Sequence, residues 1–192
     1  TMPMSTMPVQ EHIPFWYPGS PVTAGKFGLN LIWPGPISPE AYQLYVDTWN
    51  EYRGADVRMD GPNGAPKVAC TMLLAIDEQS DKALDIATRG MNGLMRRTHA
   101  VHRWDAEVLG DDAADAALGP LRRILSHIDE AIQAGAGTPE QIKERLGGIL
   151  EMGMTDNIIL QIPTGDMTLA EAKRTMDLFC SDVKPDLEKI AA

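Results

Sequence analysis

The stretch VACTMLLAI, from Val68 to Ile76, decides the fold of this chain. Apolar residues occupy both faces of this strand-length run, which is typical of a parallel strand covered on both sides. Shorter apolar runs lie at Ile13 to Tyr17, Leu29 to Trp33 and Ile158 to Ile162. Each run is linked to a segment with a helix start signal and helical spacing of apolar residues. The sequence therefore predicts repeated strand–helix units with parallel strands and right-handed crossovers.

The starts of the predicted helices are marked by capping residues. Ser20-Pro21 and Ser38-Pro39 each place a capping serine before a proline at the first helical position. Thr138 to Gln141 and Thr168 to Glu171 have the spacing of capping boxes, in which two side chains satisfy the first free N–H groups of a helix. Residues 54–66 are rich in Gly and Pro and are expected to form a surface loop.

Two architectures share this order of strands and helices. One is a small open doubly wound sheet, and the other is half of an eight-stranded β/α barrel. Because a full barrel takes about 250 residues, four units and one helical insertion within 192 residues favour the half-barrel. We expect one domain over residues 1–192, with the insertion over residues 90–136. A half-barrel leaves two strand edges open, so another chain or a missing half has to cover them.

Composition excludes several classes of partner. The chain has 17 Lys and Arg against 27 Asp and Glu, a net charge of −10, and no basic stripe. Binding to nucleic acid or to an anionic membrane surface is therefore not expected, since both need clustered positive charge. Cys70 and Cys180 have neither disulfide-framework nor zinc-site spacing. With no signal peptide and no long apolar run, we expect a cytoplasmic protein, and the connector-like first ten residues suggest a fragment or processed product.

Three quoted stretches resemble one known family. PVQEHIPFWYPGSPVTAGKFGLNLIW (Pro8 to Trp33) resembles the fifth strand, short helix and sixth strand of bacterial luciferase-like flavin-dependent monooxygenases. VACTMLLAIDEQSDKALDIA (Val68 to Ala87) resembles their seventh strand and the following helix. GTPEQIKERLGGILEMGMTDNIILQ (Gly137 to Gln161), followed by TLAEAKRTMDLFCSDVKPDLEKI (Thr168 to Ile190), is similar to the family's final helix, eighth strand and C-terminal helix. The chain thus resembles the C-terminal half of the family's barrel, with residues 90–136 at the position of its variable lid insertion.

The resemblance implies an enzyme that uses reduced FMN and molecular oxygen to oxidise a small organic substrate. A separate flavin reductase would supply the reduced FMN, and the N-terminal half-barrel, or a second copy, would complete the fold. Some members of the family use a deazaflavin coenzyme for hydride transfer instead, and the sequence leaves that alternative open. A non-catalytic flavin-binding or assembly module and a small doubly wound phosphate-binding domain also remain as alternatives.

The sharpest candidate site is the loop Gly19-Ser20-Pro21-Val22-Thr23. A glycine lets the backbone approach an anion, and free N–H groups and hydroxyls at a helix start donate hydrogen bonds to it. By the resemblance, Gly19, Ser20 and Thr23 bind the flavin phosphate. Bacterial luciferase has an acidic residue at the position of Gly19, so this chain lacks that side-chain contact. The alternative is that Ser20 only caps a helix.

Other candidates follow from the position of active sites at the carboxyl ends of barrel strands. Trp33, the residues near Ile76, and Gln161 to Thr164 are candidates for a substrate pocket. Trp33 can flank a flavin ring or pack in the core, and Gln161 can bind a ligand or satisfy backbone groups.

The basic segment Arg96 to Arg103 is a further candidate, as a lid over an anionic ligand or as a solvated helical face. In the first case His99 or His102 would act as an acid or base. No metal site is expected, because only Asp105 could serve as a third ligand beside the two histidines. The sequence identifies no catalytic residue, because the family draws its catalytic side chains from strands that would precede Thr1.

Overall fold

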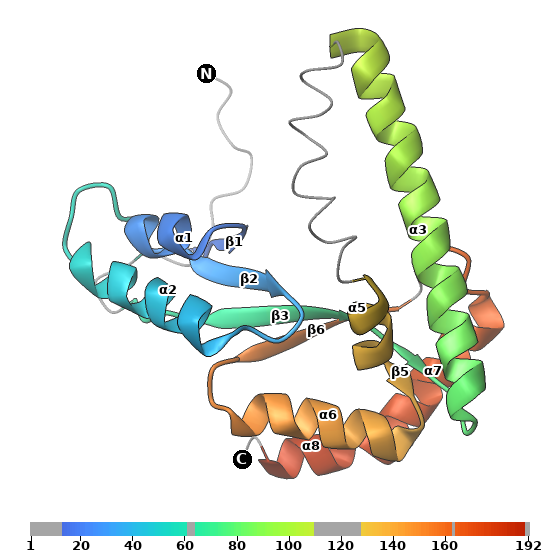
Figure 1. Ribbon diagram of the computed structural model, residues 1–192. Coiled ribbons are helices and arrows are strands. Elements are labelled where there is room, and N and C mark those ends of the chain that lie inside the picture. Colours follow the sequence, from blue (N-terminus) through green and yellow to red (C-terminus); the bar gives the residue numbers. More distant parts are fainter. Residues whose placement is uncertain (1–12, 61–63, 110–127, 163, 191–192) are drawn as a thin grey trace, which may run out of the picture. The chain divides into compact units, whose positions relative to one another are not determined.

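The computed structural model describes residues 13–60, 64–109, 128–162 and 164–190 (Figure 1), and the side chains of residues 99–109 and 128 lie outside this description. The chain divides into two compact units. The first unit contains the described parts of residues 1–71 together with residues 152–159. The second contains those of residues 72–151 and 160–192.

A four-stranded sheet has most of its residues in the first unit, and the ends of two of its strands belong to the second. Its strands are β1 (Trp16–Pro18), β2 (Asn30–Pro34), β3 (Val68–Leu73) and β6 (Asn157–Gln161), and they lie side by side in that order. β1 pairs in parallel with β2, and β2 pairs in parallel with β3. All four predicted strands are present, with boundaries shifted by a few residues.

The order of the strands separates the two architectures that the sequence left open. Each strand of this sheet lies beside the one that precedes it in the chain, with no reversal of direction. A doubly wound sheet reverses its strand order at a switch point, whereas a barrel adds its strands in sequence. The strand order is therefore that of a β/α barrel.

Two helices cover one face of this sheet. Helix α1 (Pro21–Phe27) follows β1, and helix α2 (Pro39–Glu51) follows β2. The predicted cap of α2 is confirmed, because the Ser38 hydroxyl accepts a hydrogen bond of 3.2 Å from the Ala41 N–H. The buried core between helices and strands consists of Ala24, Leu31, Ile37, Tyr45, Trp49 and Val68.

The apolar run from Val68 changes its partner at Leu74. β3 ends at Leu73, and the run continues as β4 (Ala75–Ile76), which pairs in parallel with β5 (Ala136–Gly137) in a second, two-stranded sheet. The single strand predicted over Val68 to Ile76 is therefore divided in two, and β5 was not predicted. The strand breaks at Leu74 because of tertiary structure, since β4 pairs with β5, a strand far along the chain.

The second unit is mostly helical. Its helices are α3 (Ser80–Leu109), α5 (Ile128–Gly135), α6 (Pro139–Glu151), α7 (Leu169–Leu178), the π-helical turn η1 (Phe179–Val183) and α8 (Lys184–Ile190). Both predicted capping boxes are present: at α6 between Thr138 and Gln141, and at α7 between Thr168 and Glu171. Of the helical insertion expected over residues 90–136, residues 110–127 lie outside the described part of the chain.

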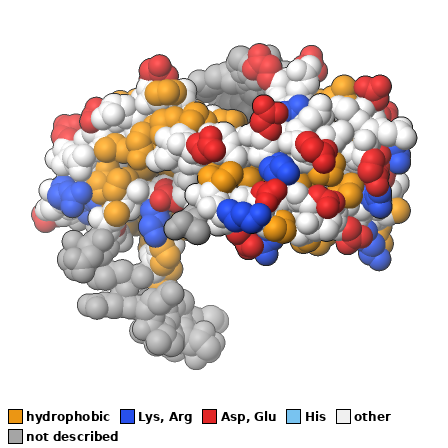
Figure 2. All heavy atoms as spheres, turned by 90° about the horizontal axis from the view of Figure 1, so that it is seen from below, with side chains coloured by type: hydrophobic (Ala, Val, Ile, Leu, Met, Phe, Trp, Pro, Cys, Tyr) orange, Lys and Arg blue, Asp and Glu red, His pale blue; other side chains and the backbone are white. Residues whose placement is uncertain are grey.

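The core of the second unit forms between β4 and three helices. Its buried members are Leu73, Ala75, Ile86, Ala87, Met91, Ile132, Ala136, Met167 and Ala172. A buried hydroxyl adds a polar contact, since Thr175 accepts a hydrogen bond of 3.1 Å from the Ile76 N–H. On the face that Figure 2 shows, acidic and basic side chains are interspersed. Lys143 and Asp186 of the second unit form an ion pair at 3.0 Å.

Candidate functional site

The predicted site, the loop between β1 and α1, leads into the N-terminus of α1. Ser20 is extended, with φ −66° and ψ 132°, and its carbonyl accepts the N–H of Ala24 at 3.0 Å, so it stands at the N-cap of α1. Its exposed hydroxyl, however, makes no capping hydrogen bond. The first N–H groups of a helix have no acceptor inside the helix. The Ser20 hydroxyl does not supply an acceptor for the first amides of α1.

The matching serine at the next helix behaves differently. Ser38 also precedes a proline at the first helical position, but its hydroxyl accepts a hydrogen bond from the Ala41 N–H. The two Ser-Pro starts thus have the same sequence pattern and different local bonding. For Ser20, the alternative that it caps α1 through its side chain is not what the structure shows.

The ring of Tyr17 lies over Gly19. A Cβ atom at position 19 would lie 2.5 to 2.7 Å from three atoms of the Tyr17 phenol, including its oxygen. Because side chains two apart in an extended chain point to the same side, a glycine at position 19 leaves room for this ring. The phenol oxygen therefore lies beside the loop, at the position where a larger residue 19 would place its own side chain. Sequence reasoning missed Tyr17, although its spacing from Gly19 was a usable signal.

The other predicted pocket residues occupy separate places. Trp33 is half-buried and packs against the core of the first unit. Gln161 is exposed, and its backbone carbonyl accepts hydrogen bonds from the Leu74 N–H and the Thr164 hydroxyl. Ser20 and Trp33 belong to the first unit and Gln161 to the second.

The basic segment starting at Arg96 lies on helix α3. The guanidinium groups of Arg96 and Arg97 are ion-paired with Asp166, in the loop that follows β6. His99 and His102 are helical in backbone, and their side chains lie outside the described residues. The predicted roles of these two histidines stay predictions.

A buried carboxylate follows β4, among the residues near Ile76 that were expected at a pocket. Asp77 is only 3% exposed, lies 2.9 Å from the Lys82 ammonium, and accepts the N–H of Gln79 at 3.2 Å. Burial by itself raises the pKa of this carboxyl, but the hydrogen bonds from Lys82 and the Gln79 N–H outweigh it and hold the pKa below its ordinary value. Asp77 is thus an ionised, fully bonded group that holds the turn leading into α3.

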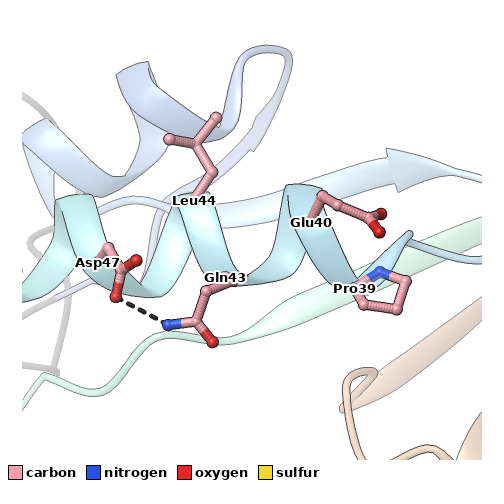
Figure 3. Close-up of a pocket in the computed structure, with 5 residues that line it drawn as sticks. All are labelled: Pro39, Glu40, Gln43, Leu44 and Asp47. Carbon is pink, nitrogen blue, oxygen red and sulfur yellow. Dashed lines mark hydrogen bonds between the residues drawn. The ribbon is translucent and has the colours of Figure 1, made fainter.

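A shallow groove lies on the outer face of α2 (Figure 3). It is lined by Pro39, Glu40, Gln43, Leu44 and Asp47, and Gln43 donates a hydrogen bond of 2.7 Å to Asp47. These side chains are exposed, and two of them are acidic. The groove is therefore open to solvent, unlike the concave pockets that enclose a small organic ligand.

The described part of the chain has neither a metal-ligand cluster nor a helix that could span a membrane. No group of three His, Cys, Asp or Glu side chains there is arranged to hold a metal ion. None of the described helices combines the length and apolar character needed to cross a lipid bilayer.

Solved structures of several enzymes share this fold. The monooxygenase RslO1 from Streptomyces bottropensis matches with a TM-score of 0.51 and 18% identity, over 86% of this chain and 44% of that chain. The oxygenating constituent of 3,6-diketocamphane monooxygenase from Pseudomonas putida, a type II Baeyer–Villiger monooxygenase solved in complex with FMN, matches at 0.50 and 15%, over 90% and 47%. The coenzyme F420-dependent tetrahydromethanopterin reductase from Methanopyrus kandleri matches at 0.50 and 19%, over 91% and 51%.

These similarities establish the fold. The chain has an α/β fold of parallel strands and helices like that of one half of a β/α barrel, and it spans about half the length of the structures it matches. No protein-family model matches the sequence, and no curated protein sequence matches it.

Proposed function

We propose that this chain is the flavin-phosphate-binding half of a luciferase-like flavin-dependent oxidoreductase. The observation that carries the proposal is the loop after β1, where the Ser20 hydroxyl makes no capping bond and the first amides of α1 have no helical acceptor. The similarity in fold to monooxygenases, one of them in complex with FMN, supports the same conclusion.

The residues of this loop fit a phosphate group. Gly19 leaves room for the Tyr17 ring beside the loop, and Ser20, Thr23 and the amides of Val22 and Thr23 supply donors. Bound FMN would supply the redox chemistry, with oxygen and a small organic substrate as co-reactants and a flavin reductase as the source of reducing equivalents. The protein's part is then to hold the phosphate, orient the ring and exclude water.

A second half-barrel completes the proposed enzyme. β1 and β6 are the outermost strands of the sheet in the described part of the chain, so their outer edges are free to pair. The matched structures are about twice as long as this chain. We assign the covering role to an N-terminal half of the same kind, with a second copy of this chain as the alternative.

The cofactor has one specific rival. The F420-dependent reductase matches the fold as well as the monooxygenases do, and a deazaflavin coenzyme also carries a phosphate. A flavin-binding module without turnover is the non-enzymatic alternative. Oxygen consumption with reduced FMN supports the monooxygenase, whereas hydride transfer from a reduced deazaflavin without oxygen supports the reductase.

The decisive experiment is a titration of the purified chain with FMN, followed by fluorescence and thermal stability. We expect Ser20→Ala to weaken FMN binding by about 10- to 100-fold, the loss expected for one charge-assisted hydrogen bond. Thr23→Ala should weaken binding in the same direction. Folding should be nearly unaffected by Ser20→Ala, because the Ser20 hydroxyl does not cap α1.

Ser38→Ala is the matched control. It removes a serine before a proline at a helix start, as Ser20→Ala does, but it also removes a capping bond. We expect this control to lower the free energy of unfolding by about 1 kcal/mol and to leave FMN affinity unchanged. Equal FMN affinity in Ser20→Ala and the wild type would overturn the assignment of the phosphate site.

A further inference from the structure

The loop that follows β6 packs directly on the backbone of helix α3. A Cβ atom at Gly90 would lie 2.9 Å from the Thr164 carbonyl oxygen, and one at Gly93 would lie 2.5 Å from the Asp166 carboxyl carbon. Gly165 has φ +54°, and a side chain there would overlap the Gly90 carbonyl. Glycine on both partners therefore lets two backbones meet without side chains between them.

Charged contacts hold the same two segments together. Asp166 accepts Arg97 at 3.1 Å and is also ion-paired with Arg96, so one carboxylate bridges two guanidinium groups. A second guanidinium nitrogen of Arg97 donates to the Gly165 carbonyl at 2.8 Å. These are charge-assisted bonds between two elements that are far apart in the sequence.

A third arginine extends the network to the start of α7. Arg89 lies 2.5 Å from Glu171 and 2.9 Å from Asp85. Glu171 also accepts the Thr168 N–H in the capping box of α7. The segment from residue 164 to Thr168 is thus held at both ends, by Asp166 against α3 and by Glu171 against Arg89.

We infer that Asp166 is a positioning residue, which latches the loop at the carboxyl end of β6 to helix α3. The latch makes the loop and the helix move together, so a shift of α3 is transmitted to a loop placed where β/α barrels carry their active-site groups. Arg96 and Arg97 are 71% and 65% exposed, so dissolved ions reach them and the latch responds to salt. The inference rests on the proposed function only for the expectation that this loop takes part in flavin binding.

Amide hydrogen exchange of the full chain, without flavin, tests the latch. In Asp166→Asn we expect exchange over residues 164–168 to accelerate by about three- to tenfold, with a smaller increase over residues 90–98 of α3. The wild type in 1 M salt should show the same acceleration, and salt should have little further effect on Asp166→Asn, because the Debye length is then about 3 Å.

Glu188→Gln is the matched control. It also removes one carboxylate from an exposed ion pair, with Lys184 at 3.4 Å, and it lies on α8 outside the loop. If losing any exposed carboxylate had the same effect, Asp166→Asn and Glu188→Gln would show the same exchange profile. That result would overturn the latch. Acceleration in Asp166→Asn that spreads evenly over the whole chain would overturn it too, since it would report a global loss of stability.

A flavin titration of the same variants separates this inference from the proposed function. If the wild type binds FMN, Asp166→Asn should weaken binding by about two- to fivefold, whereas Glu188→Gln should not. Localised exchange in a chain that binds no FMN would uphold the latch and contradict the proposed cofactor site.

Discussion

Arg58 is expected to contribute more to stability than any exposed charge of the first unit. Its side chain is 7% exposed, and its guanidinium carbon lies 4.2 Å from the centre of the Trp49 ring. One nitrogen donates to the carbonyls of Gly25 at 3.2 Å and Trp49 at 2.9 Å. Two other nitrogens bind the Asp60 carboxylate at 2.6 and 2.5 Å. The side chain therefore ties the loop after α2 to both helices of the unit.

Replacing Arg58 by Ala removes all of these contacts at once. Two carbonyls lose a charged donor, the Trp49 ring loses a stacked cation worth about 0.5–2 kcal/mol, and Asp60 keeps its charge without a partner. We expect a loss of about 3–5 kcal/mol, the cost of breaking a buried ion pair on one side. Arg58→Lys keeps the charge but cannot form the planar fork, so it should cost about 1.5–3 kcal/mol.

Urea unfolding followed by circular dichroism measures the effect. Arg53→Ala is the control, since Arg53 is exposed and its side chain donates a hydrogen bond of 3.3 Å to the Asn50 side chain; its cost should stay below about 0.5 kcal/mol. A cost of Arg58→Ala below about 1 kcal/mol would refute this reasoning, because the contacts would then behave like those of a surface pair. Arg58→Lys as stable as the wild type would refute the role of the fork.

The acid limb of the stability curve gives an independent check. The hydrogen bonds from Arg58 hold the pKa of Asp60 below its ordinary value. A carboxyl with a lowered folded-state pKa contributes stability above its unfolded pKa of about 3.9 and loses it as the pH falls through the lowered value. The stability difference between the wild type and Asp60→Asn should therefore be full at pH 6 and shrink below about pH 4.

Three further predictions concern single positions. Thr175→Val should lower the free energy of unfolding by about 1–3 kcal/mol in urea titration, because the buried Ile76 N–H loses its acceptor at 3.1 Å. Gly148→Ala should raise the melting temperature and stabilise α6 by about 0.5–1 kcal/mol, since a Cβ there meets no atom within 4 Å; a loss of stability would contradict the described helix. Burial raises the pKa of the Cys70 thiol to about 11, so a thiol reagent at neutral pH should modify only the exposed Cys180 in the native chain and both cysteines after unfolding.

The features that the sequence predicts well are local ones. The capping serine at residue 38 and the capping boxes at Thr138 and Thr168 form their bonds within four residues, so the pattern alone specifies them. The apolar runs of the four main strands are also local signals. The order in which those strands pair involves distant parts of the chain, and the sequence left it open between a barrel and a doubly wound sheet.

The features that sequence reasoning missed depend on distant partners. Arg58 lies in a stretch rich in Gly and Pro, a composition that predicts a solvated loop. Its guanidinium nevertheless donates to the carbonyls of residues 25 and 49, which lie in the two preceding helices. Leu74 lies inside a continuous apolar run, and only the pairing of Ala75 with Ala136 explains the break there. For the candidate site, the sequence predicted Ser20. Only the structure shows that the Ser20 hydroxyl makes no capping hydrogen bond.

The short parallel pairing of β4 with β5 has a consequence for how the chain tolerates change. Ala75 pairs with Ala136 and Ile76 with Gly137, so the long segment between these two strands begins and ends at neighbouring points. Its two ends are held by this pairing and by the core residues that α3 and α5 contribute next to the strands. Doubling the length of a flexible connecting segment costs only about 0.6 kcal/mol in loop-closure entropy. Insertions, deletions or a fused reporter domain in the middle of the segment that connects β4 to β5 should therefore leave the rest of the second unit folded.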